Sequence, residues 1–237
     1  MPTAATRRWP SRPPRPWLPN AARARPRPDH DVADRSLVIA CGALAWEIMA
    51  LIHANGWDAI EVQCLPADWH NRPQLIPEGV REKIRAAREE FDHIYVAYGD
   101  CGTGGLLDAV LEEEGVERIR GPHCYQFYAG DEEFTALHEA ELGTFYLTDY
   151  LAKHFETLIL KGMGVDRHPE IESMLFGNYK KLVYLAQTHN ADVEAKARAA
   201  AERLNLDFEM IFTGYGGLQP LLAEANNAAT RVQLWQP

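Results

Sequence analysis

The sequence has 237 residues, of which 46% are apolar, and its 24 basic and 34 acidic residues give a formal charge of −10. A chain of this length can fill one globular core. No stretch approaches the ~18 consecutive apolar residues that a membrane span requires. The composition therefore excludes a membrane protein, a collagen-like chain and a small disulfide scaffold.

The first 35 residues differ from the rest. Seven arginines, no acid and eight of the fifteen prolines fall within residues 1–28. Proline removes backbone donors and like charges repel, so we expect residues 1–35 to form a disordered leader. A basic arm that touches nucleic acid or anionic lipid is the alternative. The remainder is strongly acidic, which argues against nucleic acid as the main partner.

Short apolar runs alternate with helical patterns from Ser36 onward, which indicates a single α/β domain over residues 36–237. We predict strands at 36–41, 59–65, 93–99, 181–187 and 207–214, with a weaker strand at 117–121. We predict helices at 43–56, 76–91, 104–115 and 191–205. This order predicts a doubly wound, mostly parallel sheet with helices on both faces. Residues 130–180 look helical, and we interpret them as a helical insert.

Cysteines stand at the ends of predicted strands. In a parallel sheet the carboxyl ends of the strands share one edge, so we expect Cys41, Cys101 and Cys124 to meet there. Cys41 and Cys101 each lie between a strand and a helix, where the helix dipole favours a thiolate. The alternative is that the cysteines are buried small hydrophobes, and we assign this role to Cys64, which lies inside an apolar run.

Three thiolates at one edge repel unless a cation neutralises them. A zinc ion would take the three cysteines with His70, His123 or water as the fourth ligand. An iron–sulfur cluster would take the same three cysteines and leave one iron free. The sequence leaves the choice between zinc and a cluster open.

The loop at 98–107 combines glycines with one acid and one thiol. Gly102, Gly104 and Gly105 let the backbone approach a ligand, and their N–H groups are candidates to bind an anion. Asp100 is a candidate catalytic acid or base. The alternative is a tight turn that needs glycine for its geometry alone.

Three further segments supply candidate substrate-binding and acid/base groups. They contain Trp69, His70, Asn71 and Arg72 after the second strand, His123 and Tyr125 around Cys124, and Tyr215 and Gly216 after the last strand. Such side chains suit recognition of a small polar ligand, and His70 or His123 is a candidate general acid/base. A Pro-bounded connector and core aromatics are the alternatives.

Several of these segments together resemble one bacterial and archaeal family, catalogued as domain of unknown function 1638. The segments that carry the likeness are IACGAL, VQCLPADWHNRP, YGDCGTGGL, GPHCYQFYAG, TFYLTDYLAKHF and GYGGL. The likeness extends roughly from Leu37 to Leu218. The resemblance implies a cytoplasmic protein, gives weight to Cys41, Cys101 and Cys124 as a set, and implies a link to one-carbon and corrinoid metabolism. It implies no particular activity.

Three functional hypotheses follow. The first is a cytoplasmic metal-binding protein, expected to be an enzyme, that acts on a small polar substrate at a three-cysteine zinc or iron–sulfur site. The second is a metal-free thiol enzyme with Cys101 as the nucleophile. The third is a non-catalytic module that delivers a metal or a corrinoid-like ligand to a protein partner.

Overall fold

The computed structural model of this chain describes residues 35–119 and 121–231. The predicted leader, apart from Arg35, therefore lies outside the described residues. The α/β class and the parallel pairing of the strands are confirmed, and the strands form two sheets. Strands β1 (Ser36–Cys41), β2 (Ile60–Leu65) and β3 (His93–Ala97) form the first sheet, in the order β2-β1-β3. Strands β4 (Thr144–Leu147), β5 (Lys181–Ala186) and β6 (Asp207–Phe212) form the second, in the order β4-β5-β6.

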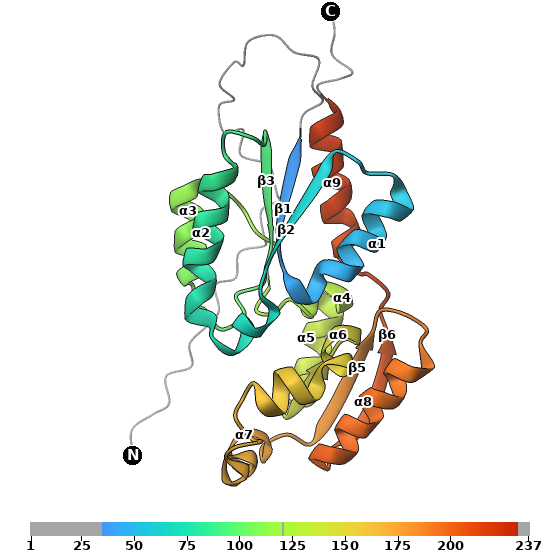
Figure 1. The fold of residues 1–237 in the computed structure, drawn as a ribbon. Helices are drawn as coiled ribbons and strands as arrows, with labels where there is room; N and C mark the ends of the chain where they lie inside the picture. Colours follow the sequence, from blue (N-terminus) through green and yellow to red (C-terminus); the bar gives the residue numbers. More distant parts are fainter. Residues whose placement is uncertain (1–34, 120, 232–237) are drawn as a thin grey trace, which may run out of the picture.

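The first lobe consists of the first sheet and four helices, which cover both of its faces (Figure 1). These helices are α1 (Ala45–Asn55), α2 (Ile76–Ala87), α3 (Leu106–Glu114) and α9 (Leu218–Arg231). Every residue of β1 is buried, as expected for the central strand of a sheet covered on both faces. The weaker strand expected at 117–121 contributes only one bridge in the described chain, between Val96 and Arg118.

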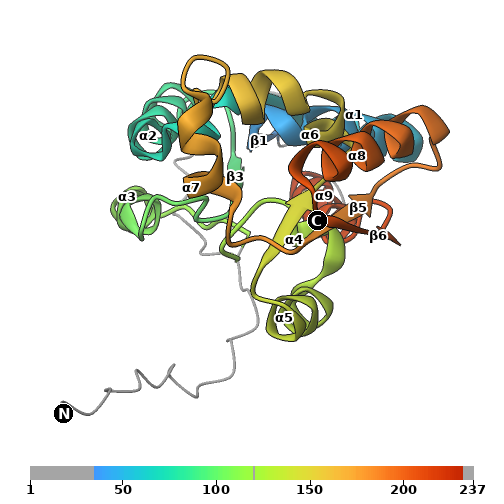
Figure 2. The same cartoon turned by 90° about the horizontal axis from the view of Figure 1, so that it is seen from below.

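The second lobe consists of the second sheet and the remaining helices. These are α4 (Gln126–Ala129), α5 (Asp131–Ala140), α6 (Asp149–Lys153), α7 (Glu172–Phe176) and α8 (Ala191–Leu204), with a π-helical segment at Phe155–Lys161. Figure 2 shows α5 on one side of the sheet and α6 and α8 on the other. Alternate residues of β5 follow this division, because Leu182 and Tyr184 join the core under α8 while Val183 and Leu185 pack with Phe134 of α5.

The predicted helical insert at 130–180 is mostly helical but also contains β4. Strand β4 is an edge strand of the second sheet, and Asp149 follows its carboxyl end. The Asp149 carboxylate accepts hydrogen bonds from Tyr184 Oη at 2.6 Å, from the Gln187 amide at 3.0 Å and from Thr188 Oγ1 at 2.5 Å. These bonds hold the carboxyl ends of β4 and β5 together.

Helix α9 returns the chain from the second lobe to the first. Leu218, Leu222 and Ala225 are fully buried in the core of the first lobe, and Ser36 Oγ donates to the Ala225 carbonyl at 2.7 Å. The chain therefore passes from the first lobe to the second and back again. Within the described residues no helix is both long and apolar enough to cross a membrane.

The turn before α9 packs closely on α4. Gly217 N–H donates to the Phe127 carbonyl at 2.6 Å, and a Cβ placed on Gly216 would lie 2.3 Å from the Tyr128 carbonyl oxygen. Gly216 also has a φ of 47°, in the left-handed region that favours glycine. Gly216 thus has a packing role at this turn.

The neighbouring Gly214 offers a matched control, because its φ is 58° but a Cβ there would meet nothing within 4 Å. We expect Gly214→Ala to lower the free energy of unfolding by about 1 kcal/mol through backbone strain alone. Gly216→Ala adds a clash with backbone atoms, so we expect a further loss of about 2 kcal/mol. Urea denaturation followed by circular dichroism measures both, and equal losses would contradict the close approach.

Candidate functional site

Three of the four cysteines come together at the carboxyl end of the first sheet. Cys41 is the last residue of β1, Cys101 lies in the loop after β3, and Cys124 lies in the segment that leads to α4. All three are buried, with exposed fractions of 7%, 4% and 9%. The Sγ atoms of Cys101 and Cys124 are 3.2 Å apart, and the Gly99 amide donates to Cys124 Sγ at 3.3 Å. The sulfur cluster of Cys41, Cys101 and Cys124 is thus a feature of the fold.

Protons are shared unequally within the sulfur cluster. Hydrogen bonds from Cys124, which has the largest effect, and from His123 and His70 together lower the pKa of Cys101 to about 3 against the effect of burial. The pKa of Cys41 is also lowered, chiefly by its hydrogen bond with Cys124. The pKa of Cys124 is raised, because it donates to Cys101 and Cys41 and is buried. Cys101 is therefore a thiolate at neutral pH, and Cys124 is the thiol that stabilises it.

The two predicted histidines both lie at the cluster. A hydrogen bond to Cys101 raises the pKa of His70, and burial opposes the shift. His70 nevertheless keeps an exposed surface, which lets it exchange protons with solvent. The His123 ring stacks on Tyr125 with centroids 4.8 Å apart. The structure thus brings His70 and His123 to one thiolate, as expected for groups that move protons there.

Backbone conformation explains why Cys101 reaches the cluster. Cys101 adopts a φ of 48°, which is unusual for a residue with a side chain, and its amide donates to the Pro122 carbonyl at 2.7 Å. A Cβ on Gly99 would lie only 2.6 Å from the His123 carbonyl carbon and 2.9 Å from the Cys124 nitrogen. The loop after β3 therefore touches the segment of Cys124 backbone to backbone, and this contact requires glycine at position 99.

The glycine loop has a different role from the one its sequence suggests. Asp100 accepts hydrogen bonds from Thr103 Oγ1 at 2.6 Å and from the amides of Gly104 and Gly105 at 3.1 and 2.9 Å. Partial burial raises the pKa of Asp100, but these bonds outweigh that effect and leave the pKa below its usual value. The amides that we expected to face an anion are bound to Asp100, which closes the loop. Helix α3 begins only at Leu106, so Cys101 is not at its N-terminus.

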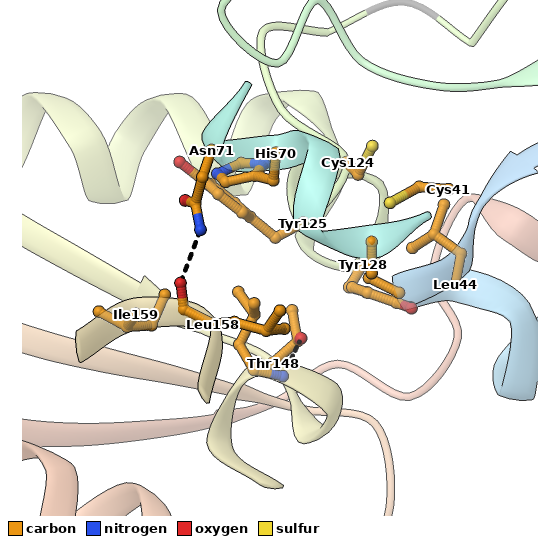
Figure 3. A pocket seen from close by; sticks show the side chains of 13 residues that line it. Cys41, Leu44, His70, Asn71, Cys124, Tyr125, Tyr128, Thr148, Leu158 and Ile159 are labelled. Atoms are coloured by element: carbon orange, nitrogen blue, oxygen red, sulfur yellow. Dashed lines mark hydrogen bonds between the residues drawn. The ribbon is translucent and has the colours of Figure 1, made fainter. Parts of the chain in front are cut away.

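A pocket adjoins the sulfur cluster and lies between the two lobes (Figure 3). Its volume is about 40 Å³. The wall from the first lobe and the segment before α4 includes Cys41, Leu44, His70, Asn71, Cys124 and Tyr125. The opposite wall includes Thr148, Leu151, Leu158 and Ile159. Asn71 Nδ2 donates to the Leu158 carbonyl at 2.7 Å and so links the two walls.

Several predicted binding residues lie away from this pocket. The Trp69 ring packs over α2, since a Cβ on Gly79 would meet it at 2.3 Å. Arg72 is exposed and forms an ion pair with Asp68. Tyr215 packs against the core of the first lobe, and burial raises its pKa. Among the residues predicted to bind substrate, only Asn71 and Tyr125 line the pocket in the described chain.

Sequence reasoning missed the wall that the second lobe supplies. Thr148 and Leu151 lie just after β4, at a junction of strand and helix like the one that Cys41 forms at the end of β1. The only sequence signal for β4 was the apolar run TFYL. A strand of four residues is too short to stand out from the helical patterns on either side of it. Tyr128, one turn beyond Cys124, also lines the pocket.

Glu47 of α1 is a buried acid near this junction. Only 2% of its surface is exposed, and its Oε2 atom has no hydrogen-bond partner among the described residues. Burial raises the pKa of Glu47, and the charge of Asp149 raises it further. Ionisation of Glu47 is therefore easier in the unfolded chain, and the protein loses stability as the pH rises through the range where Glu47 ionises.

We expect Glu47→Gln to raise the free energy of unfolding by about 1–2 kcal/mol at pH 8, because the amide cannot ionise. The gain should vanish below pH 4.5, the ordinary pKa of a glutamate carboxyl, where Glu47 is protonated in both the folded and the unfolded state. Urea denaturation at both pH values measures the difference. The exposed Glu82 of α2 serves as the control, since Glu82→Gln should change nothing, and a Glu47→Gln effect independent of pH would contradict the assignment.

The Cys101 and Cys124 sulfurs lie closer together than two ligands of one zinc ion do. Within residues 35–119 and 121–231, no three or more His, Cys, Asp or Glu side chains are arranged as a ready-made metal site. Zn–S bonds of about 2.3 Å put tetrahedral sulfurs about 3.8 Å apart, whereas the Cys101 and Cys124 sulfurs are 3.2 Å apart. A metal ion held by both cysteines would therefore require the two sulfurs to separate by about half an ångström.

Comparison with known proteins gives one match. The family described as "Protein of unknown function (DUF1638)" matches residues 64–222, which include Cys101, Cys124 and both walls of the pocket except Cys41 and its neighbours. No curated protein and no solved structure matches the chain.

Proposed function

The chain belongs to the DUF1638 family, to which no activity is assigned, and we propose that it binds one thiophilic metal ion through Cys41, Cys101 and Cys124. The observation that carries this proposal is the convergence of three buried cysteines, from separate segments, on one end of an interlobe pocket. Sulfur and imidazole are the donors that zinc and iron–sulfur clusters prefer. His70 is the candidate fourth ligand.

An unpaired polar atom beside the sulfur cluster supports the proposal. His123 Nδ1 is buried and has no hydrogen-bond partner among the described residues, whereas the Tyr98 hydroxyl hydrogen-bonds to Cys41. Buried polar groups are generally paired, so this ring nitrogen points to a further group that it would contact. A cation would also relieve the repulsion that keeps three thiolates from coexisting in one site.

The proposal assigns separate tasks to the chain. The three cysteines and His70 hold the ion, His123 is the candidate general acid/base beside the site, and the pocket holds a substrate next to the sulfurs. A bound zinc ion would supply Lewis-acid chemistry, and a cluster would supply electron transfer or a free iron. All four cysteines of the chain are free, and we place the protein in the cytoplasm, where thiols stay reduced.

We expect protein purified without oxygen to contain about one metal ion or one cluster per chain. Elemental analysis measures the content, and the visible spectrum separates colourless zinc from a brown cluster. Cys41→Ser, Cys101→Ser and Cys124→Ser should each lose the metal. Cys64→Ser is the matched control, because Cys64 lies on β2 outside the pocket lining. A metal-free chain whose three thiols all titrate freely would refute the proposal.

The short contact between Cys101 and Cys124 favours a second candidate, a metal-free thiol enzyme. In this case the Cys124 thiol keeps its proton and donates a hydrogen bond to the Cys101 thiolate at 3.2 Å, and Cys101 attacks an electrophilic substrate and displaces its leaving group. Cys101 is only 4% exposed, so the substrate would have to reach it past Cys124.

A labelling experiment separates the two candidates. If Cys101 is a free nucleophile, iodoacetamide at pH 6 should alkylate Cys101 alone, about one group per chain, and Cys101→Ser should abolish labelling. If a metal is bound, none of the three cysteines should react until a chelator removes it. Mass spectrometry of the peptides reads both outcomes.

A further inference from the structure

Cys101 and Cys124 are close enough to bond to each other. Their Sγ atoms are 3.2 Å apart, and the sulfurs of a disulfide are about 2.05 Å apart. Disulfide formation therefore requires the two sulfurs to approach by about 1.2 Å, whereas a shared metal ion would require them to separate. The geometry of the pair thus permits a reaction that needs no metal ion.

Backbone hydrogen bonds keep the two sulfurs together, although they are 23 positions apart in the sequence. The Gly99 amide donates to Cys124 Sγ at 3.3 Å, and the Cys101 amide donates to the Pro122 carbonyl at 2.7 Å. The segments that carry the two cysteines are therefore bonded to each other directly. Because both backbones are fixed in this way, the sulfurs stay within reach of each other.

The pocket brings a small molecule to this pair. Cys124 and Cys41 line it, and Figure 3 shows their side chains at one end. Its volume of about 40 Å³ corresponds to about three water molecules, so it admits a molecule of two or three non-hydrogen atoms. The lining also includes His70 and Thr148, which offer hydrogen-bonding groups among the aliphatic side chains. Hydrogen peroxide is small, uncharged and able to form hydrogen bonds, so it fits this space.

We propose that Cys101 and Cys124 are a redox-active pair that reduces hydrogen peroxide and forms a disulfide. One of the two sulfurs attacks a peroxide oxygen, the O–O bond breaks, and the departing oxygen leaves as water with the proton of that thiol. The other sulfur attacks the resulting sulfenic acid, the S–O bond breaks, and a second water leaves with the proton of the second thiol. The two sulfurs lose two electrons and the peroxide gains them. A dithiol reductant restores both thiols.

This inference does not depend on the proposed metal ion. A disulfide removes two of the three sulfur donors, so the ion and the disulfide exclude each other. The test therefore starts from the full chain, reduced and incubated with a chelator. Where cytoplasmic proteins of mesophiles contain disulfides, these are usually transient, with a catalytic or redox-sensing role.

The test treats this protein with a small molar excess of hydrogen peroxide. Free thiols, titrated in denaturant, should fall from four per chain to two, and dithiothreitol should restore all four. Trypsin cleaves after Arg118, so mass spectrometry without reduction should find one linkage, between the peptides of Cys101 and Cys124. Cys64→Ser is the control and should lose the same two thiols, because Cys64 lies outside the pocket lining.

A matched pair of glycine substitutions tests the backbone contact. Gly99→Ala places a Cβ 2.6 Å from the His123 carbonyl carbon, which forces the two cysteine segments apart. We expect it to slow disulfide formation about tenfold or more, because small misplacements of reacting atoms cost large factors in rate. Gly115→Ala is the control, since its φ is 64° and a Cβ there would meet nothing within 4 Å. It should react as fast as the parent.

A second pair of substitutions tests the route to the sulfurs and keeps the test valid if Gly99→Ala does not fold. Ala67 lines the pocket, so Ala67→Leu should fill it and slow the reaction with peroxide about tenfold. Ala109→Leu, on the exposed face of α3, is the control and should react as the parent does. Circular dichroism verifies that each variant is folded.

The outcomes separate this inference from the proposed function. A linkage of Cys41 to Cys124, or oxidation of one cysteine without loss of its partner thiol, would overturn the assignment of the pair. So would parent-like rates in folded Gly99→Ala and Ala67→Leu. The proposed function is tested separately, by the metal content before the chelator is added. A chain without metal that still forms the Cys101–Cys124 disulfide would overturn the proposed function and support this inference.

Discussion

The arrangement of the site depends on one constraint, the backbone contact between the loop after β3 and the segment of Cys124. Gly99 lies so close to His123 and Cys124 that no side chain fits between them. This contact lets the Gly99 amide bond to Cys124 and sets the Cys101 and Cys124 sulfurs 3.2 Å apart. Without it Cys124 would be one more cysteine in a connecting segment, because its segment contributes no strand to the first sheet.

Negative charge is distributed unequally between the sulfurs of Cys101 and Cys124. Hydrogen bonds concentrate negative charge on Cys101, and the same bonds keep the proton on Cys124. Such a pair presents a deprotonated sulfur that a thiophilic ion can bind. Metal uptake would then release the proton of Cys124, so we regard the thiol–thiolate pair and the metal site as two protonation states of one cluster.

The approach of Cys41 and Cys101 could be predicted from the sequence for a physical reason. Strands that run parallel must end at the same edge, so Cys41 and Cys101 were bound to lie near each other once β1 and β3 were recognised. Trp69, Arg72 and Gly216 could not be assigned in this way. Their roles depend on a helix face, an ion pair and a turn that meet only after folding. The second sheet was missed because β4 has four residues and lies between helices.

The polar groups that a segment contains do not by themselves predict which ligand a pocket binds. The glycine loop contains backbone donors that suit an anion, but Asp100 from the same loop accepts two of them. Arg72 is likewise neutralised by Asp68, four residues earlier in the chain. Residues close in sequence thus form hydrogen bonds and ion pairs with these charged and polar groups, which are then not available to bind a substrate. The space left for a ligand is bounded by aliphatic side chains from both lobes, by the sulfurs of Cys41 and Cys124, and by His70, Asn71, Tyr125, Tyr128 and Thr148.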